Sequence, residues 1–151
     1  MQEALKLATK AAKKKEVPVG AIIVDPIENK IIARGFNCCE STKSPLNHAE
    51  IIAITKACKK KNSKNLSGCH IYVTLEPCAM CAAAISYARL SRIYYGASDA
   101  KFGAIENGVR IFNSTSHLFK PEIYGGILAK ESQELLQNFF KSVRKQARSC
   151  I

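Results

Sequence analysis

Two short segments, about thirty residues apart, constrain how this chain can fold. The first is residues 48–50 (His-Ala-Glu) and the second is residues 77–81 (Pro-Cys-Ala-Met-Cys). Each stands where an apolar helical pattern begins, and Pro77 suits the first turn of a helix, where its missing N–H costs nothing. Cys78 and Cys81 are spaced i, i+3 and therefore share one helix face. A fold that uses both segments must bring two helix N-termini to one point.

The donor types in these segments match those of a zinc site. A helix dipole stabilises thiolates at its N-terminus, so the cysteine pair can grip one ion. With His48 the protein ligands number three, and three ligands plus one water is the pattern of a catalytic zinc rather than a structural one. Such a metal lowers the pKa of its water towards about 7. Glu50 is then the natural proton carrier, provided that the metal lies off the helix end.

Other interpretations of the cysteines stay open at this point. A lone C-x-x-C is also found as a redox pair, although a thioredoxin-like site has no third ligand. Cys38 and Cys39 could form a second metal pair. Adjacent side chains rarely chelate together, so we interpret these two as loop residues. We interpret Cys58 and Cys69 as small buried hydrophobes.

Hydrophobic periodicity divides the chain into helices and strands. Turn residues between the first two strands predict a hairpin, and the later strands alternate with helices, which favours parallel pairing. We expect an α/β fold with one mixed sheet covered by helices on both sides, in a single domain over residues 1–151. The expected helices are 2–15, 48–61, 78–88 and 131–148, the expected strands are 17–25, 31–36, 69–75, 92–96 and one within 122–128, and residues 37–47 form an irregular loop.

Two of these helices carry a marked apolar face, and that of helix 48–61 is expected to form part of the core. The expected core stripe of helix 48–61 is Ile51, Ile52, Ile54, Thr55 and Cys58, and the apolar face of helix 131–148 is Leu135, Leu136, Phe139, Phe140 and Val143.

Residues 97–118 show no strong period. His70 and His117 have no partners at ligand spacing, so we interpret both histidines as structural.

The charge balance is strongly basic, with 23 Lys and Arg against 12 Asp and Glu, a net charge of +11. Such an excess suggests a polyanionic partner, nucleic acid above all, although solvated lysine faces are also common. No apolar run approaches the roughly 18 residues of a membrane span. Seven cysteines without an apolar leader indicate a reducing cytoplasm.

The motif H-x-E followed by P-C-x-x-C is the signature of zinc-dependent nucleobase deaminases. The surrounding residues resemble the bacterial tRNA-specific adenosine deaminases over nearly the whole chain, from about residue 3 to 146. The resemblance implies a cytidine-deaminase-like three-layer fold with a five-stranded mixed sheet, a homodimer, and deamination of the wobble adenosine of tRNA to inosine. The segments that carry it are 16–21, 35–37, 48–51, 72–81, 96–104 and 126–131.

The resemblance also implies a role for individual residues. Glu50 moves protons between the zinc-bound water, the ring and the leaving ammonia. Asn47 and the segment 105–121 depart from the family pattern. The zinc ligands are His48, Cys78 and Cys81, the substrate-binding residues are Asn37 and the backbone of Ala49, and the RNA-binding residues are Asp99, Lys101, Phe140, Lys141 and Arg144.

Two alternative functions remain at this stage. The same chemistry could act on free cytosine, guanine or a nucleoside, but a free base requires neither the net charge of +11 nor a basic C-terminal helix. A nucleic-acid-binding module with a structural zinc would need a fourth ligand. Cys38 or Cys39 is the only nearby loop source, and Glu50 would then be dispensable.

Overall fold

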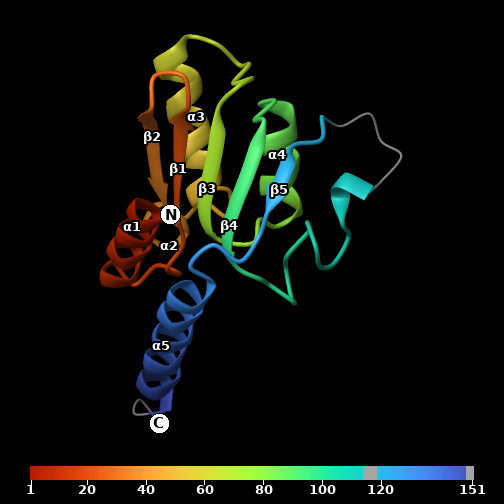
Figure 1. Ribbon diagram of the computed structural model, residues 1–151. Helices are drawn as coiled ribbons and strands as arrows, with labels where there is room; N and C mark the ends of the chain where they lie inside the picture. The colour runs from red at the N-terminus through yellow and green to blue at the C-terminus, as the bar shows by residue number, and fades with distance from the viewer. Residues whose placement is uncertain (114–118, 149–151) are drawn as a thin grey trace.

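The computed structural model describes residues 1–113 and 119–148 (Figure 1). Its five strands form one sheet in the order β2-β1-β3-β4-β5. The first three pair antiparallel in that order, whereas β3, β4 and β5 run parallel, so the predicted hairpin and mixed sheet are confirmed. The elements are α1 (Gln2–Lys13), β1 (Gly20–Asp25), β2 (Lys30–Phe36), α2 (Cys39–Thr42), α3 (Ala49–Lys61), β3 (His70–Leu75), α4 (Ala79–Tyr87), β4 (Arg92–Ala97), the 3₁₀ turn η1 (Ile111–Asn113), β5 (Glu122–Tyr124) and α5 (Ala129–Arg148).

Helices cover both faces of the sheet, as predicted. Successive strand residues point to opposite faces, so Gly20 and Gly35, which occupy neighbouring register positions, face opposite sides. Gly20 lies against α1, and Gly35 lies against α3, which also contacts α4. The first turns of α5 pack against β4 on the α1 side, and the rest of α5 projects beyond the strand ends (Figure 1). This arrangement leaves α5 beside one end of the sheet.

The buried face of α3 agrees only in part with the predicted stripe. Ile54 is buried as predicted, and Ile51, Ile52 and Cys58 are partly buried. Ala49, Ala53 and Ala57 are fully buried, whereas Thr55 is exposed. The reason lies in Gly35 of β2, where an added Cβ would overlap the carbonyl oxygen of Ala49 and lie 2.9 Å from the nitrogen of Ala53. Since α3 lies directly on the strand backbone, only small side chains fit at the contact.

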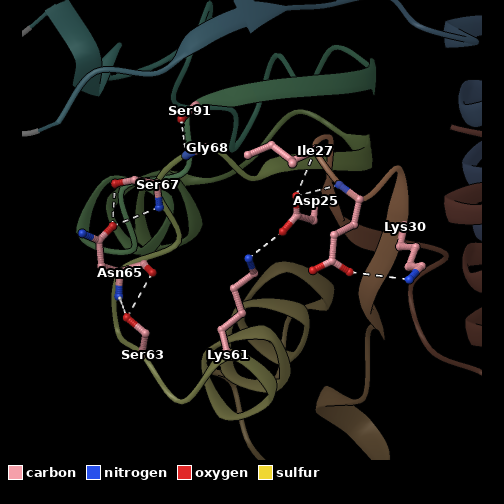
Figure 2. Close-up of polar contacts among 10 residues, drawn as sticks. Asp25, Ile27, Lys30, Lys61, Ser63, Asn65, Ser67, Gly68 and Ser91 are labelled. Carbon is pink, nitrogen blue, oxygen red and sulfur yellow. Dashed lines mark hydrogen bonds and ion pairs between the residues drawn. The ribbon is translucent and has the colours of Figure 1, made fainter.

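Polar contacts fix the end of the sheet that carries the β1–β2 turn (Figure 2). Asp25 accepts the backbone N–H of Ile27 at 3.0 Å and forms an ion pair with Lys61, at the end of α3, at 2.6 Å. The backbone N–H of Gly68, just before β3, donates to the Ser91 hydroxyl at 2.8 Å. These bonds tie the hairpin turn to α3, and the connection into β3 to the start of β4.

Several predicted boundaries are corrected. The first strand begins only at Gly20, and the loop 37–47 contains the short helix α2, whereas the last strand lies within 122–128 as predicted. Residues 114–118 of the atypical segment 105–121, including His117, lie outside the described residues. Among the residues that the structure describes, no helix is long and apolar enough to cross a membrane.

Candidate active site

The two constraining segments meet at one end of the sheet. His48 caps α3 and Cys78 caps α4, each with extended backbone angles, and Cys81 lies in the first turn of α4. The Nδ1 atom of His48 lies 3.7 Å from the sulfur of Cys78 and 3.5 Å from that of Cys81. One ligand atom from each residue lies within 4.8 Å of the others, a spacing that fits a single metal ion.

The three donor groups are hydrogen-bonded to one another. Hydrogen bonds from the Cys81 thiol and from His48 lower the pKa of Cys78 to about 4. The hydrogen bond between Cys81 and Cys78 raises the pKa of Cys81 far above its ordinary value. The hydrogen bond between His48 and Cys78 raises the pKa of His48. A metal ion binds the sulfur and nitrogen lone pairs that otherwise carry these protons, so metal binding releases the protons. Two sulfurs and one imidazole nitrogen are a donor set that suits Zn²⁺.

Glu50 lies in the first turn of α3 and is only 4% exposed. Burial raises the pKa of its carboxyl, and its hydrogen-bonding contact with the Cys81 thiol places it next to the metal-ligand group. His48 stands before the helix rather than in it, so its ring reaches off the helix end. This explains how two residues at i, i+2 serve one site.

A pocket of about 900 Å³ opens over this group. Its volume lies within the usual range for ligand-binding sites. One wall comes from the segments around Val19 and Asn37, another from the loop after β4, and α5 contributes Leu136 and Phe140. The sequence predictions His48, Glu50, Cys78, Asn37, Asp99, Lys101 and Phe140 all line it.

Asn37 follows β2 and is 9% exposed. Its side-chain oxygen accepts the backbone N–H of Ala49 at 2.9 Å, which satisfies the first free N–H group of α3. The Asn37 Nδ2 group is therefore the part of the amide that can donate to a ligand. Ala49 is fully buried and is not among the pocket-lining residues, so its predicted place in the pocket wall is corrected; its backbone N–H instead fixes the Asn37 side chain.

The predicted RNA-binding residues divide into two groups. Asp99, Lys101 and Phe140 lie at the pocket, whereas Lys141 and Arg144 are exposed on α5 outside its lining. The apolar face of this helix is divided: Leu135, Leu136 and Phe139 are partly buried, whereas Phe140 and Val143 are each 44% exposed.

Two buried carboxylates were missed by the sequence prediction. Glu16 accepts the backbone N–H groups of Glu40 and Ser41 at 3.0 and 2.7 Å and so holds α2 at the pocket. Glu76 holds the opposite loop. It accepts hydrogen bonds from backbone N–H groups and from two side chains, namely Asp99 N, Ile105 N, Glu106 N, Asn107 N, Asn107 Nδ2 and Ser98 Oγ.

The carboxylate of Glu76 is held in its charged form. Burial alone would raise the pKa of Glu76, but hydrogen bonds from Asp99 and Asn107 outweigh it and bring the pKa to about 2. The only sequence signal was an acidic residue just before Pro77. Its partners are mostly backbone groups, which have no side-chain signature.

Cys38 and Cys39 do not join the metal-ligand group of the described residues. The Cys38 thiol donates to the Phe36 carbonyl at 3.3 Å, and Cys39 lines the pocket. Neither supplies the fourth ligand that a structural zinc would require. Cys69 is buried as predicted, and Cys58 is partly buried.

Known proteins that resemble this chain identify its family. Residues 1–144 match the MafB19-like deaminase family. The tRNA-specific adenosine deaminase of Rickettsia bellii (strain RML369-C) is 56% identical over 144 residues, covering 95% of this chain and 99% of the relative. The chain belongs to the family of tRNA-specific adenosine deaminases. The resemblance noted from the motifs is thereby confirmed.

Solved structures agree with membership of the tRNA-specific adenosine deaminases. A structure from work on A-to-I editing by tRNA:A34 deaminases at the wobble position of transfer RNA has a TM-score of 0.87 and 45% identity, covering 90% of this chain and 97% of that chain. A guanine deaminase from Nitrosomonas europaea has a TM-score of 0.80 at 20% identity, covering 91% and 81%. The second match shows the shared fold alone.

Proposed function

We propose that this chain is a zinc-dependent deaminase that converts the wobble adenosine of tRNA anticodon loops to inosine and releases ammonia. One observation carries the proposal. His48, Cys78 and Cys81 lie close enough to bind one ion, and the buried carboxyl of Glu50 lies beside them in the same pocket. Three protein ligands leave a fourth position on a tetrahedral metal, as a hydrolytic site requires.

His48, Cys78 and Cys81 would hold zinc, which when bound supplies a water activated at neutral pH. Glu50 would take a proton from the attacking water and deliver it to ring atom N1 as the water oxygen bonds to C6. Glu50 then passes the second water proton to the exocyclic amine, the C6–N bond breaks, and ammonia leaves. A single buried carboxyl beside the metal-ligand group can both accept and donate protons, as a general acid–base residue must.

The residues around the pocket suit a nucleotide that has turned out of an RNA loop. The Asn37 Nδ2 group can donate to an acceptor nitrogen of the base. Lys101 stands at the pocket with a cationic side chain for a phosphate, and Phe140 offers an exposed ring. Lys141 and Arg144 extend the positive charge along α5, where they can contact the RNA backbone.

The main competing function is deamination of a free base or nucleoside by the same chemistry. The guanine deaminase fold is similar, so the fold alone does not separate the two. The net charge of +11 and the exposed basic helix beside the pocket favour RNA, because a free base uses neither.

The test is a comparison of substrates. Purified zinc-loaded protein is incubated with an anticodon stem-loop carrying a wobble adenosine, and separately with free adenosine, cytosine and guanine. The proposal expects inosine in the stem-loop and little turnover of the free compounds, and Glu50→Ala serves as the inactive control. Turnover of a free base without inosine in the stem-loop would favour the competing function.

We also infer a homodimer and a cytoplasmic location. The homodimer follows from the family resemblance rather than from a described contact, and the location follows from the cysteine content and the proposed substrate. A thiol-based zinc site needs a reducing compartment, and the proposed tRNA substrate lies in the cytoplasm. Light scattering of the purified protein tests the dimer.

A further inference from the structure

Phe102 is an exposed aromatic residue at the pocket. It is 63% exposed, more than most large apolar side chains of the described chain, yet it lines the pocket that holds His48 and Glu50. The Nζ atom of Lys101 lies over the Phe102 ring, 4.8 Å from its centroid. One face of the ring thus carries a cation, and the high exposure leaves the ring available to a second flat group.

The backbone holds Phe102 firmly despite its exposure. The carboxylate of Asp99 accepts the backbone N–H groups of Lys101 and Phe102 at 2.9 and 3.0 Å. The next residue is Gly103, where an added Cβ would lie 2.5 Å from the carboxylate of Glu76, so the loop can close around Glu76 only with glycine there.

The same loop is tied to the metal-binding segment. Gly103 forms an isolated β-bridge with Cys78, and the backbone N–H of Ala104 donates to the carbonyl of Pro77 at 3.0 Å. The position of Phe102 relative to the metal ligands is therefore set by short backbone connections. An aromatic residue whose backbone is already fixed at a pocket loses less conformational freedom when a ligand binds than one on a free loop.

We infer that Phe102 is a stacking platform for an unpaired base next to the adenosine that enters the pocket, with Lys101 on the other face of the ring. This inference rests on the proposed function. Unpaired RNA bases are commonly stacked on aromatic side chains, and a neighbouring cation attracts their phosphates. The charge of +11 and the second exposed ring at the pocket, Phe140, fit an RNA loop better than an uncharged partner.

Three substitutions separate stacking from simple apolar packing. Phe102→Ala removes the ring, Phe102→Leu keeps an apolar side chain without a flat face, and Phe102→Trp keeps the flat face. Steady-state kinetics on an anticodon stem-loop give kcat and KM, and zinc content and light scattering report the state of each variant. Base stacking on an aromatic side chain predicts that Phe102→Ala raises KM roughly 5- to 150-fold with kcat within about twofold.

We expect Phe102→Leu to resemble Phe102→Ala, and Phe102→Trp to resemble the wild type. A wild-type KM in Phe102→Ala, or full rescue by leucine, would overturn the inference. Loss of zinc or a fall of kcat alone in Phe102→Ala would assign Phe102 a structural role. A change in the oligomeric state of Phe102→Ala would assign Phe102 to a subunit interface. Either a structural role or an interface role would overturn the inference that Phe102 stacks on a base.

A fluorescence measurement tests stacking directly. Stem-loops with 2-aminopurine on either side of the wobble position are bound to the wild type and to Phe102→Ala. Stacking predicts quenching at one of the two positions in the wild type and its loss in the variant, whereas equal quenching in both proteins would overturn the inference. Failure of the proposed function would instead appear in the wild type itself, as an absence of inosine.

Discussion

Replacement of Glu76 by glutamine tests whether a buried carboxylate builds one wall of the pocket. One carboxylate oxygen accepts the N–H of Asp99 at 2.9 Å, the Nδ2–H of Asn107 at 2.6 Å and the hydroxyl of Ser98 at 3.3 Å, while the other accepts three backbone N–H groups. The Ser98 hydroxyl can also accept a hydrogen bond from an NH₂ group, so the bonds at stake are those from Asp99 and Asn107. In Glu76→Gln one oxygen becomes an NH₂ group. The NH₂ group cannot accept hydrogen bonds from the N–H groups on its side, so donor groups then point at one another.

Two estimates of the loss in the free energy of unfolding agree. Loss of two hydrogen bonds to a charged group, at about 1.5–3 kcal/mol each, sets an upper range of about 3–6 kcal/mol. The pKa of Glu76 falls from an ordinary 4.5 to about 2, which corresponds to about 3 kcal/mol, since each tenfold change in proton affinity is worth about 1.4 kcal/mol. We therefore expect Glu76→Gln to lower the free energy of unfolding by about 3 kcal/mol.

Urea denaturation and thermal melting measure this loss. For a chain of this size the expected fall in Tm is roughly 6–12 °C. Glu40→Gln is the matched control, because the side chain of Glu40 is exposed, and it should cost less than about 0.5 kcal/mol. KM for the stem-loop should also rise, since the loop that holds Lys101 loosens. If Glu76→Gln unfolds at the same urea concentration as Glu40→Gln, our account of this wall is wrong.

Three further predictions concern the metal, the proton carrier and pH. The wild type should contain about one zinc per chain by elemental analysis, and Cys81→Ser should lose most of it, whereas a metal-free active protein would contradict the site. Glu50→Gln should retain zinc and fold but lose roughly 10²-fold or more in kcat, and an unchanged rate would remove Glu50 from the mechanism. Because the pKa of Glu76 is depressed in the folded state, its stabilisation is present above pH 4.5 and is lost as the pH falls to about 2. Acid titration should therefore destabilise the wild type more steeply than Glu76→Gln, and parallel curves would refute this assignment.

The metal-ligand group could be predicted because the residue types and the local spacing within each of its two segments carry the signal. The i, i+3 spacing of Cys78 and Cys81 and the start of a helix at His48 restrict where the donors can lie. The hairpin was equally predictable, because Asp25 accepts backbone N–H groups of its own turn. In each case the residues that carry the signal also make the contact.

Other features depend on partners far away in the sequence. Glu76 binds backbone groups more than twenty residues later, and nothing in the sequence of that loop marks its N–H groups as donors. The buried alanines of α3 follow from the close approach of Gly35, which a periodicity argument based on large residues cannot detect. The exposure of Phe140 on α5 was expected only from the family resemblance, since apolar spacing alone does not tell burial from a binding surface.

The central claim is that this pocket deaminates adenosine in the anticodon loop of tRNA. The most direct measurement is mass spectrometry of a stem-loop, carrying a single wobble adenosine, after incubation with zinc-loaded wild-type protein. We predict conversion of that nucleotide to inosine with release of one ammonia per conversion. An unchanged adenosine under conditions where the protein holds its zinc would contradict the account.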